Sequence, residues 1–371
     1  MEILHICSYY LGSKLYKNLF NNLNKSIRNY IFVPINNNEK INISDDLEEN
    51  NKIYIEKCFN STDRLFFFKK NKKILEALMK TEILKKNISL LHAHTLFTNG
   101  YVAYKIKKKY NIPYIVAIRN TDINVFFKYF FFLRKYGIKI LKNANKIIFL
   151  SPSYEEYCLS KYIPKDKYEE FKKKSIVIPN GIDKYWIENL VDYKKRNSEL
   201  RLIYVGSINE NKNVKTSILA CRRLIEKGYQ VKFTIIGDLE INLKEIKEPF
   251  IEYIPFCSKE RIKEYLSESD IFIMPSKYET FGLVYAEALS QGLPIIYTRG
   301  QGFDKQIPEG KVGYSVKYND IDEIIEKIIK IYNNYDKYSA KTKEYVNKFN
   351  WKYIAEKYEK IYNEVVNREA N

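Results

Sequence analysis

Two glutamates, Glu279 and Glu287, stand eight positions apart in the segment ETFGLVYAE. The apolar run IFIMPS precedes them, so a strand should end and a helix should begin between the two carboxyl groups. A glycosidase places its two carboxyls roughly 5 to 9.5 Å apart, whereas eight residues of helix rise about 12 Å. The spacing therefore disfavours an acid and a base that act on one glycosidic bond.

A clamp around a ligand fits this spacing better. The amides of Phe281, Gly282 and Leu283 would begin the helix as free donors, an arrangement that binds phosphate, and glycine allows a close approach. Glu279 and Glu287 could then accept hydrogen bonds from hydroxyls on the two sides of the phosphates. This layout suits a nucleotide diphosphate sugar. Two ordinary surface glutamates on an amphipathic helix are the alternative.

Short β-rich runs alternate with helix-length segments in both halves of the chain. Those of the first half are MEILHICS, NYIFVPI, ISLLHAHT, PYIVAIRNT and KIIFLSPS, and those of the second are ELRLIYVGS, YQVKFTIIGD, FIEYIPF, DIFIMPS and GLPIIYTRG. The alternation predicts two doubly wound α/β domains with parallel sheets, which bind ligands at the carboxyl ends of their strands. We place the N-terminal domain at 1–178, the C-terminal domain at 179–345 and a final helix at 346–371.

The net charge of +18 is concentrated in the first half of the chain. Residues 1–178 contain 32 Lys and Arg against 16 Asp and Glu, whereas residues 179–371 contain 31 against 29. A coding bias toward lysine would raise the positive charge of both halves. The excess in the first half alone therefore indicates that this half meets an anionic partner. Residues 102–146 hold 11 of these cations around the aromatic run NVFFKYFFFLRKYG, and FFFKKNKK at 66–73 repeats the theme. Such stretches suit an anionic membrane surface; a core helix packed on the sheet is the alternative.

Cysteine and histidine are sparse. The five cysteines are scattered without a C-x-x-C pair, and three histidines in the whole chain argue against a His-rich metal centre. We expect no metal, no other cofactor and a reducing compartment. The N-terminal segment has neither a basic n-region nor a small-residue cleavage site, and no apolar run is long enough to span a bilayer. The expected location is the cytoplasm.

The context of the two glutamates resembles a known family. The run SKYETFGLVYAEALSQGLPII is similar to the signature of the retaining glycosyltransferases of family four, and SIVIPNGID, LIYVGSINENKNV and FTIIGD resemble further segments of that family. The resemblance covers most of the chain and is loosest in the N-terminal third. It implies the α/β GT-B fold, in which two Rossmann-like domains face a cleft and the C-terminal helix crosses back to the N-terminal domain.

The resemblance also implies roles for residues of the C-terminal domain. Glu279 would hold hydroxyls of the donor sugar, Glu287 would hold the ribose, and the amides of Phe281, Gly282 and Leu283 would bind the diphosphate. Lys212 would neutralise the diphosphate as the bond to the anomeric carbon breaks, because the leaving group gains charge there. A solvated loop lysine is the alternative for Lys212.

Two residues of the N-terminal domain complete this set. His94, in HAHT, would face the donor sugar, and Gly12, in YYLGSK, would form a turn near the diphosphate. The alternative for His94 is a histidine at the end of a strand that is hydrogen-bonded to backbone. The alternative for Gly12 is a plain turn. His92 is expected to point into the sheet.

Two positions depart from the family pattern. Many members have an arginine where this chain has Ser207, so one diphosphate-binding cation is missing, and Arg299 or Arg119 could replace it. Many members also have a His-Gly pair where this chain has Arg119 and Asn120. An arginine there suits a phosphate or carboxylate on the acceptor. A structural ion pair with Asp122 is the alternative.

The implied enzyme is a metal-independent, retaining hexosyltransferase-type glycosyltransferase. It would move a sugar from a nucleotide sugar to an acceptor hydroxyl, and the departing phosphate would act as the base. The basic, aromatic first half favours a lipid-linked or cell-surface glycan precursor as acceptor, in polysaccharide biosynthesis at the inner face of the cell membrane. A non-catalytic GT-B partner subunit and a basic nucleic-acid-binding protein are the alternatives, although no nucleic-acid-binding motif is present and no nucleic acid is expected as a partner.

Overall fold

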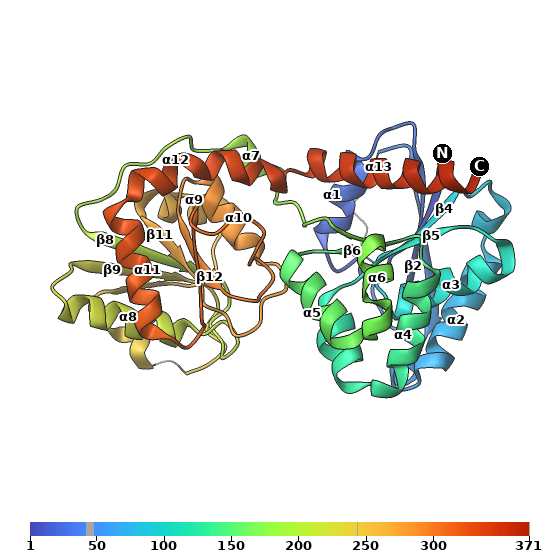
Figure 1. The fold of residues 1–371 in the computed structure, drawn as a ribbon, viewed down its shortest axis with the longest axis horizontal. Helices are drawn as coiled ribbons and strands as arrows, with labels where there is room; N and C mark the ends of the chain where they lie inside the picture. The colour runs from blue at the N-terminus through green and yellow to red at the C-terminus, as the bar shows by residue number, and fades with distance from the viewer. Residues whose placement is uncertain (42–47, 243, 371) are drawn as a thin grey trace. The chain divides into compact units, whose positions relative to one another are not determined.

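The computed structural model describes residues 1–41, 48–242 and 244–370, which form two compact units, each of them α/β (Figure 1). Unit 1 comprises Met1–Leu150, Glu155–Pro179 and Trp351–Asn371, and unit 2 comprises Ser151–Tyr154 and Asn180–Asn350. Apart from the short segment Ser151–Tyr154, the chain passes into unit 2 after Pro179 and returns to unit 1 at Trp351.

Unit 1 is built on a seven-stranded sheet with the order β3-β2-β1-β4-β5-β6-β7, in which all neighbours are parallel. The strands are β1 (Glu2–Ile6), β2 (Arg28–Asn36), β3 (Asn51–Phe59), β4 (Leu90–Ala93), β5 (Tyr114–Ala117), β6 (Lys146–Phe149) and β7 (Ser175–Val177). The central strands are buried on both faces, which explains their continuous apolar sequences.

Helices cover this sheet on both faces. They are α1 (Lys14–Asn22), α2 (Phe67–Lys80), α3 (Thr98–Tyr110), α4 (Phe131–Asn143), α5 (Pro152–Tyr162), α6 (Tyr168–Lys174) and α13 (Trp351–Ala370), with the short helical segments η1 (Ser61–Leu65), η2 (Glu82–Lys85), η3 (Asp122–Phe127) and η4 (Lys165–Lys167). Helix α13 packs beside α1 and shares one apolar core with β1 and β2, so both chain termini lie in unit 1 (Figure 1).

Unit 2 has a six-stranded parallel sheet with the order β10-β9-β8-β11-β12-β13. Its strands are β8 (Leu200–Val205), β9 (Val231–Ile236), β10 (Ile251–Ile254), β11 (Ile271–Ile273), β12 (Ile295–Thr298) and β13 (Gly313–Val316). Its helices are α7 (Lys184–Glu188), α8 (Val214–Glu226), α9 (Lys259–Glu268), α10 (Leu283–Ser290), α11 (Ile321–Asn333) and α12 (Tyr335–Val346), with η5 (Lys244–Lys247) and η6 (Asn347–Phe349). The predicted strand–helix alternation is confirmed in both units.

The strand order of unit 2 decides where its loops meet. Strand β8 lies between β9 and β11, and β12 follows β11 in the sheet. The loops that leave the carboxyl ends of β8, β11 and β12 therefore lie at the same edge, where such sheets bind ligands. Across the described residues, none of the helices is both long enough and apolar enough to cross a membrane.

Candidate active site

Lys212 and Glu279 meet at this edge of unit 2. Lys212 lies in the loop between β8 and α8, and Glu279 lies in the loop between β11 and α10. The Lys212 Nζ atom is 2.5 Å from the Glu279 Oε2 atom, and the two side chains are 25% and 13% exposed. The fold thus places a cation and a carboxylate together at the strand ends, where each can reach a ligand.

The loop after β12 holds Glu279 in place. The Glu279 amide donates to the Gln301 side-chain oxygen over 3.0 Å, and the Gly302 amide donates to the Glu279 carbonyl over 2.6 Å. Gly302 must be a glycine, because a Cβ atom there would lie 1.8 Å from the carbonyl oxygen of Thr280. The residues flanking the two glutamates did not point to Gln301 or Gly302, which join the site through a tertiary contact.

Helix α10 begins at Leu283, between the two glutamates, as predicted. Gly282 precedes its first residue with a left-handed φ of 74°, and a Cβ atom on Gly282 would lie 2.5 Å from the Tyr285 ring. The Phe281 side chain is buried against Phe303 and Phe349. Within the described chain, the amides of residues 281–283 have no acceptor. These free donors at the positive end of a helix form an arrangement that can bind phosphate.

Glu287 lies on α10 and is only partly exposed. Burial, reinforced by the negative charge of Asp183, raises the pKa of Glu287 to about 7, while a hydrogen bond from Trp186 and the charge of Lys259 act in the opposite direction. Lys259 Nζ lies 3.0 Å from the Asp183 carboxylate. Glu287 is therefore part of a charged, half-buried group rather than a solvated surface residue.

Of the two arginines suggested as a replacement for the missing cation at Ser207, Arg299 is paired elsewhere in unit 2. The Ser207 carbonyl accepts from the Tyr204 hydroxyl over 2.7 Å. Hydrogen bonds from the side chains of Asn209 and, second, Ser207 lower the pKa of Glu240. The guanidinium of Arg299 is bound to Glu323 and to the Ser315 carbonyl. Arg299 therefore forms a structural ion pair with the first turn of α11.

Arg119 lies in unit 1, at the end of β5. Its Nε atom donates to the His94 carbonyl over 3.2 Å, and its guanidinium stands 5.9 Å from the centroid of the Tyr16 ring. The suggested side-chain ion pair with Asp122 is wrong, because in the described chain that carboxylate accepts instead from the backbone amides of Leu96, Phe97 and Arg119. Asp122 therefore stabilises the loops after β4 and β5.

Gly12 stands in a turn of unit 1, where its amide donates to the Tyr9 carbonyl over 3.2 Å. The nearest atom to a Cβ on Gly12 would be that same carbonyl oxygen, at 3.9 Å. The protein itself therefore leaves room for a side chain, so packing within the chain does not explain a glycine at this position.

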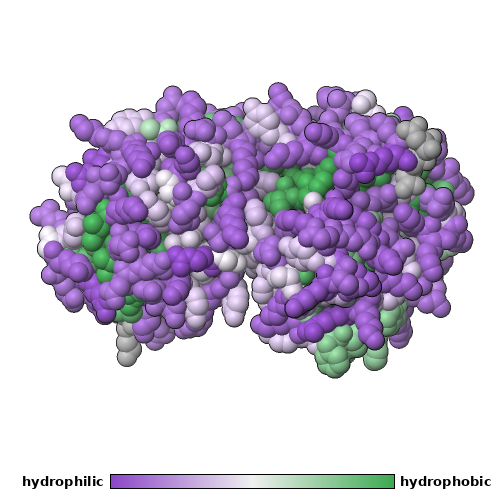
Figure 2. All heavy atoms as spheres, viewed as in Figure 1, coloured by the Kyte–Doolittle hydropathy of each residue, from purple (hydrophilic) through white to green (hydrophobic). Residues whose placement is uncertain are grey.

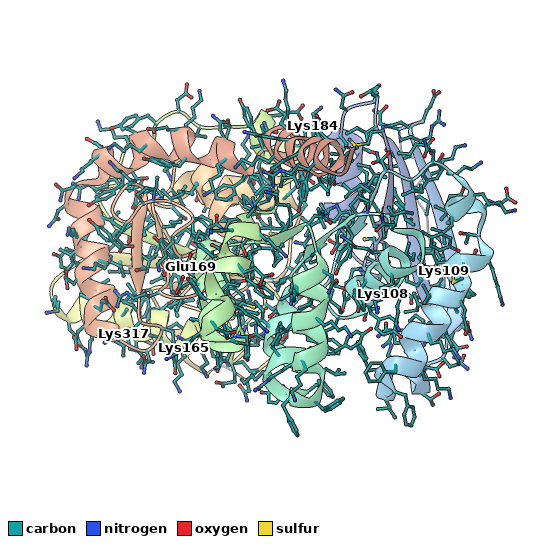
Figure 3. All side chains as sticks on the ribbon, turned by 45° about the vertical axis from the view of Figure 1, so that its right-hand side comes forward. Lys108, Lys109, Lys165, Glu169, Lys184 and Lys317 are labelled. Atoms are coloured by element: carbon teal, nitrogen blue, oxygen red, sulfur yellow. The ribbon has the colours of Figure 1, made fainter. Side chains whose placement is uncertain are left out.

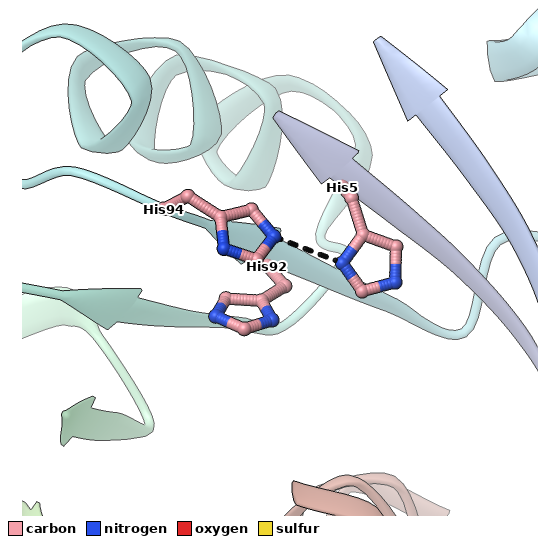
Figure 4. A group of neighbouring side chains, drawn as sticks. All are labelled: His5, His92 and His94. Atoms are coloured by element: carbon pink, nitrogen blue, oxygen red, sulfur yellow. Dashed lines mark hydrogen bonds between the residues drawn. The ribbon is translucent and has the colours of Figure 1, made fainter. Parts of the chain in front are cut away.

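The three histidines of the chain lie together in unit 1 (Figure 4). The β1–β4 register pairs His5 with His92, and the His92 and His94 rings stack with centroids 3.9 Å apart. His5 Nδ1 is 3.1 Å from His94 Nε2, and its Nε2 is 3.0 Å from the Asn29 side-chain oxygen. His92 Nδ1 is 2.9 Å from the Tyr362 hydroxyl on α13.

This cluster corrects two expectations. His92 does not point away from His94, because the two rings stack on each other, with Tyr16 of α1 against His94 and Tyr358 of α13 against His92. His94 is fully buried among His5, Tyr16 and Phe20, and its ring is bonded to His5 rather than to backbone. It therefore lies behind the ligand-binding edge of unit 1.

The three rings offer nitrogen atoms within 4.8 Å of one another, so three histidines suffice for a potential metal cluster. Their surroundings oppose a divalent cation. Both nitrogens of His5 are already engaged, and the Arg119 guanidinium stands against the His94 carbonyl. Among the described residues, neither a carboxylate nor a thiolate joins the group. Burial keeps the rings neutral, since it lowers the pKa of His5 to about 4 and those of His92 and His94 well below their usual range.

The aromatic stretch of unit 1 is divided between core and surface. Phe127 and Leu133 are buried, whereas Phe131 and Phe132 are 72% and 61% exposed. The second stretch is similarly divided, with Phe66 and Phe68 more than half exposed.

The two α/β units with parallel doubly wound sheets have the GT-B fold, and a cation–carboxylate pair and a helix N-terminus lie at one sheet edge of unit 2. A solved sucrose-phosphate synthase of Thermosynechococcus elongatus has the same fold, with a TM-score of 0.71 over 98% of this chain and 99% of that one at 18% identity. The chain belongs to glycosyltransferase family four. Residues 188–349 match the glycosyl transferases group 1 family, and residues 44–185 match Glycosyltransferase Family 4.

Two relatives illustrate the family. An uncharacterised glycosyltransferase of Methanocaldococcus jannaschii is 28% identical over 301 residues, which cover 77% of this chain and 78% of the relative. The alpha-monoglucosyldiacylglycerol synthase of Acholeplasma laidlawii is 26% identical over 277 residues, covering 67% and 68%. The protein is thus an enzyme that transfers a sugar from a nucleotide-sugar donor.

Proposed function

We propose that the enzyme transfers its sugar with retention of the anomeric configuration, and that Lys212, Glu279, Glu287 and the amides at the start of α10 bind the donor. The observation that carries this proposal is the contact between Lys212 and Glu279 beside those free amides. Without donor, the two side chains neutralise each other. When a nucleotide sugar binds, Lys212 would contact a phosphate and Glu279 would accept hydrogen bonds from sugar hydroxyls.

The chemistry follows from these positions. As the bond from the anomeric carbon to the diphosphate breaks, its electron pair remains on the phosphate oxygen, where Lys212 and the amides stabilise the added charge. The acceptor hydroxyl attacks from the same face and gives its proton to that oxygen. In this scheme no protein side chain acts as nucleophile, and the cations and dipoles of unit 2 take the place of a metal ion. Metal independence is part of the proposal.

The acceptor is proposed to be a lipid-linked or cell-surface glycan precursor, used at the cytoplasmic face of the membrane. The excess of basic residues in the first half and the partly exposed aromatic stretches support this choice. So does the relative whose name describes the synthesis of a glucosylated diacylglycerol.

Thermal shift with UDP-, GDP-, ADP- and dTDP-sugars tests the donor site, with Glu287→Ala as the matched variant. A ligand at 100 times its Kd stabilises the folded state by about 2.7 kcal/mol. A shift with one nucleotide class that disappears in Glu287→Ala would support the clamp and identify the base. NMR of the product would then assign its anomeric configuration, and activity should persist in EDTA. The absence of any shift would favour a non-catalytic subunit.

A further inference from the structure

Unit 1 contains a large apolar cavity that the donor site does not use. Its volume is about 820 Å³, and its walls come from η1–α2 and from η3–α4. The rings of Phe67 and Phe126, whose centroids are 6.0 Å apart, form part of the wall. At one end the cavity reaches the loops after β1 and β4, at Tyr9, Gly12 and Thr95. It therefore begins at the ligand-binding edge of the unit 1 sheet.

One polar side chain in this apolar wall has no partner. Asn71, on the first half of α2, lines the cavity and is completely buried, yet neither its amide nitrogen nor its side-chain oxygen is hydrogen-bonded within the described chain. Burying such a group unpaired costs about 1–3 kcal/mol for each missing bond. A ligand that carries both a donor and an acceptor would satisfy it. This feature indicates a binding site rather than a packing defect.

The other end of the cavity opens on an exposed rim of aromatic and basic residues. We define this rim by its exposed side chains Leu65, Phe66, Phe68, Phe130, Phe131 and Phe132. Figure 2 shows hydrophobic side chains gathered at the lower edge of unit 1, next to α4. Arg64, Lys69 and Lys70 stand beside them, and Lys70 is itself buried enough to lower its pKa. An exposed apolar patch of this kind marks an interaction surface.

We propose that the rim docks on an anionic lipid surface and that the cavity takes an amphiphilic acceptor from it, with the apolar chain against the aromatic wall and polar atoms of the head of the acceptor hydrogen-bonded to Asn71. The inference rests on the proposed function, since the acceptor hydroxyl must reach the strand ends near Gly12 while the chain extends toward the rim. Aromatic rings beside Lys and Arg match the headgroup layer of an anionic bilayer in both polarity and charge. The chain itself could be acyl or isoprenoid, since both are long and apolar.

The docking part is tested with the full-length protein and sedimenting vesicles. Phosphatidylcholine vesicles with and without phosphatidylglycerol are compared for wild type, Arg64→Gln/Lys69→Gln and Phe131→Ser/Phe132→Ser. Arg64 and Lys69 are exposed. Each basic residue near an anionic surface contributes about 1 kcal/mol, so the double basic-residue variant should bind anionic vesicles about 30-fold more weakly. The phenylalanine variant should lose binding even at low salt.

Matched controls remove the same groups elsewhere in unit 1. Lys108→Gln/Lys109→Gln removes two exposed charges at the carboxyl end of α3 (Figure 3). Because α3 connects the parallel strands β4 and β5, this end lies toward the amino ends of the strands, whereas α2 and the rim follow the carboxyl end of β3. Tyr353→Ser removes a 48% exposed ring from α13. Both controls should bind anionic vesicles like wild type. Failure of wild type to bind, or equal losses in the controls and the rim variants, would overturn docking.

The cavity is tested with Asn71→Leu, which replaces the unpaired amide by an apolar group of similar size. The variant should be at least as stable as wild type in thermal unfolding, yet transfer to a diacylglycerol or to a polyprenyl phosphate should fall about tenfold or more. The two acceptors distinguish the acyl from the isoprenoid source. Unchanged transfer to both would refute the cavity as the acceptor site.

The donor supplies an independent readout. The proposed function assigns nucleotide-sugar binding to residues of unit 2, so donor affinity measured without acceptor should be unchanged in Asn71→Leu and in the rim variants. If wild type binds the donor but binds neither vesicles nor amphiphilic acceptors, the acceptor inference fails and the proposed transferase function stands. If wild type binds no donor, the proposed function fails instead.

Discussion

The Lys212 ammonium group lies 2.5 Å from the Glu279 carboxylate, although 67 positions separate them in the sequence. The two residues leave neighbouring strands of one parallel sheet, β8 and β11, so the fold converts a long sequence separation into a direct contact. Such a pair at a ligand-binding edge is suited to function more than to stability, since partly exposed ion pairs contribute little to folding.

Lys212→Ala should reduce kcat about 10²- to 10³-fold, because removing a group that stabilises developing charge costs a comparable factor in other enzymes. The melting temperature should change little. Lys212→Arg should recover part of the rate, since it restores the charge with a different shape. Steady-state kinetics and calorimetry measure the two effects, and a variant that melts early but turns over normally would contradict the assignment.

Donor affinity should increase between pH 6 and pH 8, because Glu287 has a pKa of about 7 and accepts hydroxyl hydrogen bonds best as a carboxylate. Calorimetric titration at several pH values measures this, and Glu287→Gln should flatten the profile. A profile that stays steep in Glu287→Gln would assign the titration to another group.

The same residue should affect stability with the opposite sign. Burial raises the folded pKa of Glu287 above its unfolded value, so the stability present below about pH 4.5 declines as the pH rises through 7. Glu287→Gln should therefore raise the melting temperature at pH 8 while weakening donor binding. Equal melting temperatures of wild type and Glu287→Gln at pH 8 would show that another interaction offsets the cost of burying the Glu287 carboxylate.

The histidine cluster should make unit 1 sensitive to acid. The folded pKa of His5 is lowered from 6.5 to about 4, so the unfolded chain binds protons first, and stability declines as the pH falls from about 6.5 toward 4. His5 alone should account for about 3 kcal/mol of this loss. Urea unfolding of Trp186→Phe follows unit 1 through Trp351, which is buried there. His5→Gln should reduce the dependence on pH, and an unaltered slope would contradict this origin.

Gly302→Ala should abolish donor binding while leaving unit 2 folded. A Cβ atom at Gly302 would lie 1.8 Å from the Thr280 carbonyl, so the loop must move and release Glu279. Overpacking of this kind costs about 1–3 kcal/mol. Gly228→Ala is the control, because its left-handed φ of 90° is strained but nothing lies within 4 Å of the added carbon. If both variants bind donor normally, the loop after β12 does not position Glu279.

Local sequence patterns determined the architecture of this protein and one part of its site. Apolar runs of strand length alternating with amphipathic segments are short-range features, so they predicted two parallel sheets. The spacing of Glu279 and Glu287 likewise predicted the start of α10, because the glutamates, the glycine and the helix are adjacent in the chain.

Only the tertiary structure decided the contacts between distant segments. The register of β1 on β4 places His5 beside His92, and α13 places Tyr362 against the same His92 ring. The number and spacing of the three histidines in the sequence could not show that they form one buried cluster. Gln301 and Gly302, which follow β12, bind the backbone of Glu279, which follows the neighbouring strand β11. Asn71 lines an aromatic cavity. Strand order and register depend on packing summed over a whole sheet, and no local period carries that information.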